Sequence, residues 1–205
     1  MRCARPSRAP TLLPALLLLA LAAAPGRAQN LVSNPDFDAD DSLWYHDTST
    51  DQQWSAVDAD LCADSGSLTS GSVETTPGFN HFGTRPMDCV AVDPNETLYA
   101  ALRYRTDASV IRLYFTHCAD VDCSNCGSFG PYFAFAGASA TWVALGGSDT
   151  IPASGVAAVY LSISASLGSA SPFTIDLDRV YLGRDDRVFG DDFELGAPCR
   201  WSLVH

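Results

Sequence analysis

Two stretches of the chain, 98–106 and 110–117, alternate apolar and polar side chains with a period of two residues. In the second stretch Ile111 and Phe115 share one face, whereas Arg112 and Tyr114 share the other. Successive side chains of a β-strand point to opposite faces of the sheet, so this period indicates strands that are buried on one side. We therefore predict two half-buried antiparallel strands whose opposite side carries arginine and tyrosine.

Other short segments have the same character. The period of two recurs at 156–164, and further apolar runs at 132–135, 139–145 and 174–182 lie between turn-forming residues. The segment 75–85 is rich in turn residues, and we expect a loop there. Few segments show the 3.6-residue period of a helix. Eight or nine short strands at near-regular spacing predict an all-β fold, a two-sheet antiparallel β-sandwich (jelly roll) with little helix.

Residues 1–28 have the features of a secretory signal peptide. Three arginines open the segment, an apolar stretch follows at 12–24, and small residues precede Gln29. The apolar stretch is too short to span a bilayer. We therefore expect a soluble protein that is secreted or periplasmic, with a jelly-roll domain at 29–183 and a separate tail motif at 184–205.

Charge narrows the possible functions. All 12 basic residues are arginines, against 24 acidic residues, and removal of the signal would leave eight arginines and a net charge of −16. Binding of nucleic acid needs clustered cations, so we exclude nucleic acid as a partner. Without lysine, Walker loops and lysine-dependent nucleophiles are impossible, and the motifs Gly-x-Ser-x-Gly and His-Glu-x-x-His are absent. We therefore expect a protein that is not an enzyme.

The cysteines fit an oxidising compartment. Six remain after removal of the signal, and an even number in an exported chain is typical of disulfides, here three with 15 possible pairings. They are Cys62, Cys89, Cys118, Cys123, Cys126 and Cys199. A zinc cluster of His117 with the three neighbouring cysteines is an alternative, but it lacks a fourth ligand at suitable spacing.

An acidic loop follows the first predicted strand. Asp36 directly precedes Phe37, and three more aspartates, at 38, 40 and 41, lie between Phe37 and Trp44. We therefore expect the two aromatic rings to fix an acidic loop to the core. Asp36, Asp38 and Asp40 have the spacing of a calcium loop. However, the sixth position is Asp41 instead of glycine and no helices flank the segment, which argues against an EF-hand.

Several short motifs occur in the order found in one known family. Asn30-Leu-Val-Ser-Asn-Pro-Asp-Phe-Asp, with Trp44 after it, resembles the opening of secreted carbohydrate-binding modules of the cellulose- and xylan-binding type, which have a galactose-binding-like jelly roll. Ser65-Gly-Ser-Leu, the passage 89–99 and the strand around Trp142 resemble later segments of the same family. In 89–99, Asn95 replaces a glycine, and asparagine tolerates the left-handed backbone that such a turn often needs.

The last strand and the tail add to this resemblance. Thr174-Ile-Asp-Leu-Asp resembles the family's final strand, which implies a structural calcium shared by Asp38 and Asp178. Two carboxylates from opposite ends of the chain would repel each other without a cation or a proton, although a solvated acidic loop is the alternative. The tail, with Phe193-Glu194 and Trp201, resembles a short terminal motif of exported bacterial proteins.

Aromatic and planar polar side chains are the candidates for sugar binding. Sugars present apolar faces as well as hydroxyl groups, so a binding face combines exposed rings with arginine or aspartate. The outer faces of 98–106 and 110–117 offer this mixture on what we expect to be one sheet face, and two loops add to it. The candidates are Tyr99, Arg103, Arg105, Arg112, Tyr114, Trp54, Phe79 and His81. The alternative is that the arginines neutralise nearby aspartates.

These observations lead to one expected function and one alternative. We expect a non-catalytic, monomeric, exported module that binds a polysaccharide or other glycan on a sheet face or in adjoining loops, with calcium as the one possible cofactor. The step from fold to sugar is an analogy, because the same fold also serves other functions. The alternative is an extracellular structural or protein-interaction domain without a sugar ligand.

Overall fold

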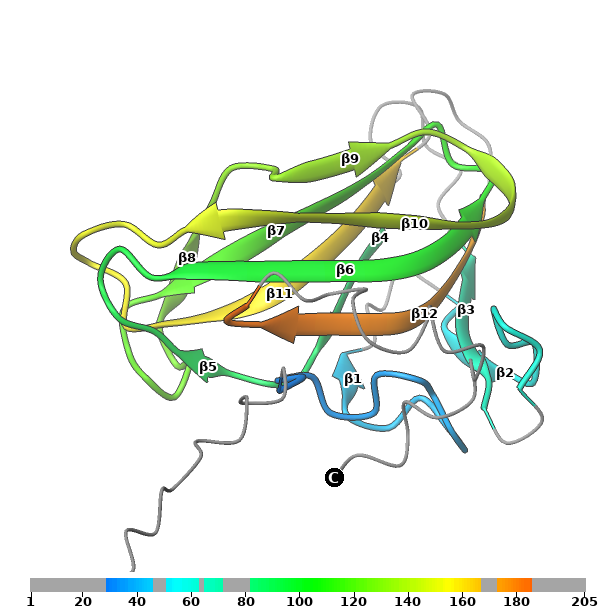
Figure 1. Ribbon diagram of the computed structural model, residues 1–205, viewed down its shortest axis with the longest axis horizontal. Helices are drawn as coiled ribbons and strands as arrows, with labels where there is room; N and C mark the ends of the chain where they lie inside the picture. Colours follow the sequence, from blue (N-terminus) through cyan, green and yellow to red (C-terminus); the bar gives the residue numbers. More distant parts are fainter. Residues whose placement is uncertain (1–28, 46–50, 63–64, 72–81, 167–172, 186–205) are drawn as a thin grey trace, which may run out of the picture.

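The computed structural model describes residues 29–45, 51–62, 65–71, 82–166 and 173–185, which form twelve β-strands and no helix (Figure 1). No described segment is therefore a helix that could cross a membrane. The strands are β1 (Trp44–Tyr45), β2 (Gln53–Ser55), β3 (Ser67–Gly71), β4 (Phe82–Pro86), β5 (Val90–Ala91), β6 (Thr97–Thr106), β7 (Val110–Cys118), β8 (Cys126–Phe129), β9 (Ala134–Ala136), β10 (Ser139–Thr150), β11 (Ala158–Ser166) and β12 (Thr174–Gly183).

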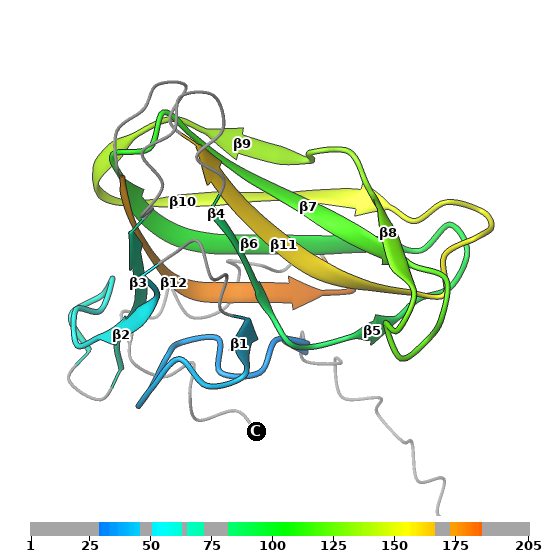
Figure 2. The same cartoon turned by 180° about the vertical axis from the view of Figure 1, so that it is seen from behind.

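The strands form two layers. A seven-stranded sheet has the order β1-β4-β11-β7-β8, with β5 beside β11 and β9 beside β7, and a five-stranded sheet has the order β10-β6-β12-β3-β2. Every strand pair is antiparallel. Figure 1 is seen from the side of β6, β10 and β12, and Figure 2 from the side of β4, β7 and β11. The prediction of an all-β antiparallel sandwich is confirmed.

The core lies between the sheets and is built from the apolar faces of the alternating strands. Leu98 and Leu102 of β6 and Ile111, Leu113 and Phe115 of β7 belong to one cluster and are all fully buried. Burial of each such side chain contributes about 1.5–3 kcal/mol to folding. The period of two in the sequence thus arises because one face of each strand is buried against the opposite sheet.

β6 and β7 lie in opposite sheets, which corrects one expectation. The predicted single face of arginines and tyrosines would need the two strands in one sheet. Instead, residues 107–109 carry the chain from one sheet to the other, and Ala108 is fully buried at this crossing. Its backbone N–H donates to Thr106 Oγ1 at 3.0 Å, and Thr106 Oγ1 donates to Thr174 O at 2.7 Å, which fixes the crossing. The outer faces of β6 and β7 therefore point away from each other.

Two local predictions met different outcomes. Asn95 has the left-handed φ of 62° that its place in the turn suggests. In contrast, part of the predicted loop at 75–85 is wrong, because β4 (Phe82–Pro86) pairs with β11 in that region. The strand was not recognised because Gly83 and Pro86 interrupt its apolar pattern. The rest of that predicted loop lies outside the described residues.

The acidic loop is fixed to the core by aromatic rings, as expected. Phe37 and Trp44 are buried, and their ring centroids lie 4.9 Å apart. A third ring joins them, since Trp54 Nε1 donates to Phe37 O at 2.7 Å. The neighbouring Gly66 has no room for a side chain: a Cβ there would lie 2.5 Å from Trp54 Nε1.

Disulfides close the loop that follows β7. Cys89 bonds to Cys123 and Cys118 to Cys126, and Cys62 is also disulfide-bonded. The sulfur atoms of Cys118, Cys123 and Cys126 are therefore all in disulfides, which removes the zinc alternative. Cys199 lies outside the described residues.

Candidate functional site

The candidate residues of β6 lie on the outer face of the five-stranded sheet and contact aspartates. Arg105 Nε pairs with Asp176, and Arg103 lies 3.8 Å from an oxygen of Asp60. Tyr99 shares their side of the strand. Both contacts therefore agree with the alternative for these arginines, namely that they neutralise nearby aspartates.

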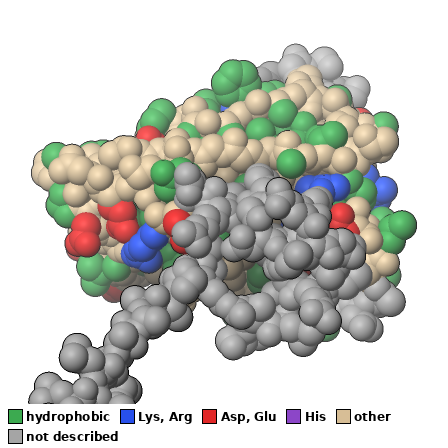
Figure 3. All heavy atoms as spheres, viewed as in Figure 1, with side chains coloured by type: hydrophobic (Ala, Val, Ile, Leu, Met, Phe, Trp, Pro, Cys, Tyr) green, Lys and Arg blue, Asp and Glu red, His purple; other side chains and the backbone are tan. Residues whose placement is uncertain are grey.

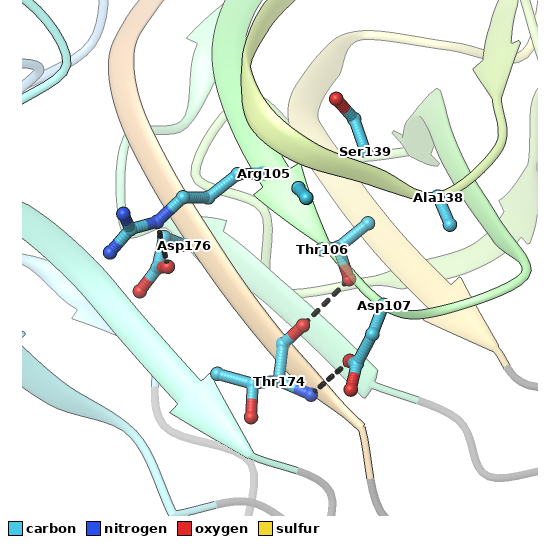
Figure 4. Close-up of a pocket in the computed structure, with 8 residues that line it drawn as sticks. Arg105, Thr106, Asp107, Ala138, Ser139, Thr174 and Asp176 are labelled. Carbon is cyan, nitrogen blue, oxygen red and sulfur yellow. Dashed lines mark hydrogen bonds and ion pairs between the residues drawn. The ribbon is translucent and has the colours of Figure 1, made fainter.

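A shallow pocket of about 350 Å³ lies beside Arg105 on this side of the molecule (Figure 4). Its polar groups are engaged with one another: Thr106 Oγ1 donates to Thr174 O, and Thr174 N donates to Asp107 Oδ1 at 2.7 Å. The visible surface above β6 and β10 is mostly backbone and uncharged side chains, with charged groups along the lower edge (Figure 3). No strip of exposed rings follows the described part of this face.

The candidate residues of β7 lie on the opposite face, where Tyr114 is packed instead of exposed. Only 7% of Tyr114 is accessible, and its ring makes edge contacts with Phe129 at 5.7 Å and Tyr132 at 5.3 Å. Burial raises the pKa of its hydroxyl group. The expectation of an exposed Tyr114 is wrong, because the rings of Phe129 at the end of β8 and Tyr132 in the connection to β9 cover it.

Those covering rings form the aromatic strip, which we define as Phe129, Tyr132 and Phe135. They are exposed by 70%, 53% and 72%. Phe129 pairs with Thr116 and Phe135 with Arg112, so both rings stand on the outer side of the seven-stranded sheet. The Arg112 guanidinium lies 5.2 Å from the Tyr132 ring centroid. A long apolar surface with a cation beside it therefore follows the edge of this sheet.

A second cation lies further across the same face. The guanidinium of Arg85 on β4 stands 4.0 Å from the Tyr160 ring centroid and 5.1 Å from that of Tyr45. Hydroxyl groups of β7 and β11 lie on the same side of the sheet, where Thr116 Oγ1 and Ser162 Oγ are 2.8 Å apart and both residues are buried. The face thus presents exposed rings with two guanidinium groups beside rings, the combination expected of a sugar-binding surface.

An aspartate cluster, defined as Asp36, Asp58, Asp60 and Asp178, joins the acidic loop to the last strand. Asp178 is fully buried and accepts hydrogen bonds from Ala59 N at 2.8 Å and from the N–H of Arg179 at 2.7 Å. Asp60 pairs with Arg179 at 2.7 Å.

Asp58 links the members of the cluster. Its carboxylate accepts hydrogen bonds from Asp60 N, Cys62 N and Ser65 Oγ at 2.6–2.8 Å, while Ser65 Oγ also lies 3.0 Å from Asp36 O. These donors lower the pKa of Asp58 below its usual value although burial alone would raise it.

The cluster holds more negative charge than its arginines balance. Burial raises the pKa of Asp178 to about 8. Burial also raises the pKa of Asp36 to about 6, opposed by Arg179 and reinforced by neighbouring aspartates. Among the described residues, the cations paired with these four carboxylates are Arg103 and Arg179, so two protons or one divalent cation would restore neutrality within this set. The donors offered are carboxylate oxygens, which fit a hard cation such as calcium.

Sequence reasoning named some residues of these regions and missed others. Asp178 lies in the aspartate cluster, but Asp38 is exposed, and Asp36 and Asp58 occupy the buried positions instead. Trp54 holds the acidic loop, while Phe79 and His81 lie outside the described residues.

The missed members of the outer face are Tyr45, Arg85, Phe129, Phe135 and Tyr160. The rings at 129, 132 and 135 could have been recognised from their even spacing in the sequence. Because the strand is interrupted between β8 and β9, all three rings can lie on one side of the sheet. The positions of Arg85 and Tyr160 depend on strand pairing and had no local signal.

Comparison with solved structures identifies the type of fold. The chain is similar to the enzymatically active domain of tailspike protein 4 of bacteriophage CBA120, with a TM-score of 0.55, 12% identity, and coverage of 75% of this chain and 21% of that chain. It is also similar to the CBM22-1 xylan-binding domain of Paenibacillus barcinonensis Xyn10C, with a TM-score of 0.51, 15% identity, and coverage of 76% and 94%.

The tandem CBM22-1–CBM22-2 domain of the same Xyn10C gives a TM-score of 0.53 at 16% identity, covering 79% of this chain and 51% of that one. The chain thus spans about a fifth of the tailspike chain and about half of the tandem domain. No family model and no curated protein matches the sequence. At these identities the likeness establishes the fold, a β-sandwich of the kind found in carbohydrate-binding modules.

The raised pKa values predict how stability depends on pH. Without divalent cations, the free energy of unfolding should fall as pH rises, because the folded pKa of Asp178 is about 8 and that of Asp36 about 6, against 3.8 for a free carboxyl group. The stabilisation is complete below the unfolded pKa and is lost as pH passes the folded values. Thermal unfolding in chelator across this range measures it.

Asp178→Asn should flatten this dependence, because an amide mimics the protonated acid but does not titrate. Asp93→Asn, at an exposed turn position that is not among the charges acting on Asp36 or Asp178, is the matched control and should leave the profile unchanged. A melting temperature that climbs steadily up to pH 8 would contradict the assignment.

Proposed function

We propose that this protein is a non-catalytic, exported module that binds polysaccharide on the outer face of its seven-stranded sheet. The observation that carries the proposal is the aromatic strip, three rings that are each more than half exposed along the sheet edge formed by β8, β9 and the residues between them. Exposed rings are costly to leave in water unless a ligand covers them. Phe129 stands opposite Thr116 and Phe135 opposite Arg112, four residues apart on β7, so at about 3.3 Å per residue the strip extends over roughly 13 Å, a length suited to a short chain of sugars.

The similarity to solved structures is independent support for this proposal. One similar domain is described as xylan-binding, and the fold is that of a carbohydrate-binding module. Catalysis has little support from the described face, because its strands hold no pair of carboxylates for glycoside cleavage. The two disulfides in the loop after β7 suit the oxidising conditions outside the cell.

We also propose that the aspartate cluster binds a structural calcium ion. Asp36, Asp58 and Asp178 would hold it, and the ion would supply the positive charge that the two arginines do not. Its role would be to fix the acidic loop against β12, away from the aromatic strip. Binding there would therefore affect stability more than sugar recognition.

The aromatic strip can be tested by truncating its exposed rings. Phe129→Ala and Phe135→Ala should each weaken binding by about 1 kcal/mol, or about fivefold, because each removes a stacking surface. Their melting temperatures should change little, since the rings are exposed. Affinity electrophoresis with xylan, hydroxyethylcellulose and polygalacturonate measures retention.

Tyr99→Ala, on the outer face of the opposite sheet, is the control and should leave retention unchanged. Tyr114→Ala should lower the melting temperature as well, because its ring is buried. Loss of retention with Tyr99→Ala and not with the strip variants would move the site to the five-stranded sheet. Retention of none of the three polymers would favour the alternative of a protein-interaction domain.

Calcium can be tested by chelation at neutral pH. A ligand that binds only the folded state at 100 times its dissociation constant adds about 2.7 kcal/mol of stability, so chelator should lower the melting temperature by several degrees. Asp178→Asn should remove most of this sensitivity, and Asp93→Asn, at an exposed position outside the cluster, should preserve it. Identical melting curves with and without chelator would show that protons alone balance the cluster.

A further inference from the structure

Acidic residues are distributed unequally between the two sheets. The chain has 24 acidic residues and 12 basic ones, yet the seven strands β1, β4, β5, β7, β8, β9 and β11 contain no aspartate or glutamate. The same strands carry Arg85 and Arg112. In the five-stranded sheet, by contrast, β10 and β12 contain Asp149, Asp176 and Asp178. The strands of the sheet that bears the aromatic strip therefore carry arginines and no acidic residues, in a strongly anionic chain.

The two arginines of this face also differ from the others in their contacts. Arg103, Arg105, Arg179 and Arg184 each pair with a carboxylate. Among the described residues, Arg85 and Arg112 have aromatic rings and a hydroxyl group as neighbours and no carboxylate partner. An arginine keeps its charge at neutral pH and binds carboxylates and other oxyanions in a bidentate manner. Each guanidinium thus keeps its capacity for an anion.

Strand register fixes the separation of the two charges. Arg112 on β7 pairs with Ser164 on β11, and Thr84 on β4 pairs with Ile163 on β11, so Arg85 stands level with Ser162. The two arginines are therefore two strands apart and two residues apart along the strands. With strand spacings of about 4.8 Å and a rise of about 3.4 Å per residue, their backbones lie roughly 12 Å from each other. Two charges at that spacing can bind two anionic groups of one extended polymer.

We infer that the ligand of this face is an anionic polysaccharide, one that carries carboxylate or sulfate groups. The inference rests on the proposed sugar-binding function and gives its substrate class. The sugar rings would lie on the aromatic strip while Arg85 and Arg112 bind the anionic groups. The negative net charge of the chain opposes this binding only weakly, since salt screens charges beyond about 10 Å at 0.1 M ionic strength.

Matched polymers test the inference on the intact protein. Polygalacturonate and its highly methyl-esterified form share one backbone and differ in charge, and dextran sulfate and dextran form a second such pair. Each charged polymer that binds should bind about tenfold or more tightly than its neutral partner, because charge-assisted hydrogen bonds contribute about 1.5–3 kcal/mol each. This advantage should shrink as salt is raised. The pair that shows it distinguishes carboxylate from sulfate.

Variants locate the effect on the two arginines. Arg112→Gln and Arg85→Gln should each reduce binding of the charged polymer about three- to tenfold and leave the neutral partner little changed. Arg85→Lys should keep part of the affinity, because it retains the charge. Arg184→Gln is the matched control, since it removes the same charge from an arginine that pairs with Glu96. Thermal unfolding of each variant shows that the fold is intact.

The outcomes separate this inference from the function on which it rests. Equal binding of charged and neutral partners, with loss of both in Phe135→Ala, would overturn the anionic ligand and keep polysaccharide binding. An equal loss of charged-polymer binding in Arg184→Gln would overturn it too, since net charge would then be the cause. Failure to retain any polymer would overturn both. A charge preference that disappears in Arg85→Gln and Arg112→Gln supports the inference.

Discussion

Burial of the apolar faces of β6 and β7 in one core is the contact on which the rest of the structure depends. The two strands follow each other along the chain but lie in opposite sheets, so burying Leu102 and Phe115 in the same interior turns their polar neighbours to opposite sides. A shift of one residue in either strand would exchange the core side chains for the arginines and tyrosines. The positions of all groups on the two outer faces follow from this register.

The two outer faces then differ in charge. On the five-stranded sheet, Arg105 neutralises Asp176, and near it Arg179 and Arg103 offset part of the aspartate cluster. On the seven-stranded sheet, Arg85 and Arg112 lie against aromatic rings in strands without acidic residues. In a chain without lysine, this division gives one set of arginines carboxylate partners and places the other set against aromatic rings.

Much of the fold follows from the sequence, and less of the site does. The period of two gave β6, β7 and β11 near their observed bounds, and Asn95 indicated its own left-handed turn. Local pattern cannot tell which sheet a strand joins, and for that reason Arg103 and Arg112 were expected on one face. It also cannot show that Phe129 and Tyr132 cover Tyr114. Such facts depend on pairing between strands that are distant in the sequence.

Polysaccharide binding on the outer face of the seven-stranded sheet can be tested by hydrogen–deuterium exchange with and without polymer. With a polymer that the protein retains, exchange should slow at 126–136 and in β7, where the aromatic strip and Arg112 lie. Exchange in β6 and β10 should stay the same. Protection confined to β6 and β10, with 126–136 unchanged, would contradict the claim and place the ligand on the five-stranded sheet.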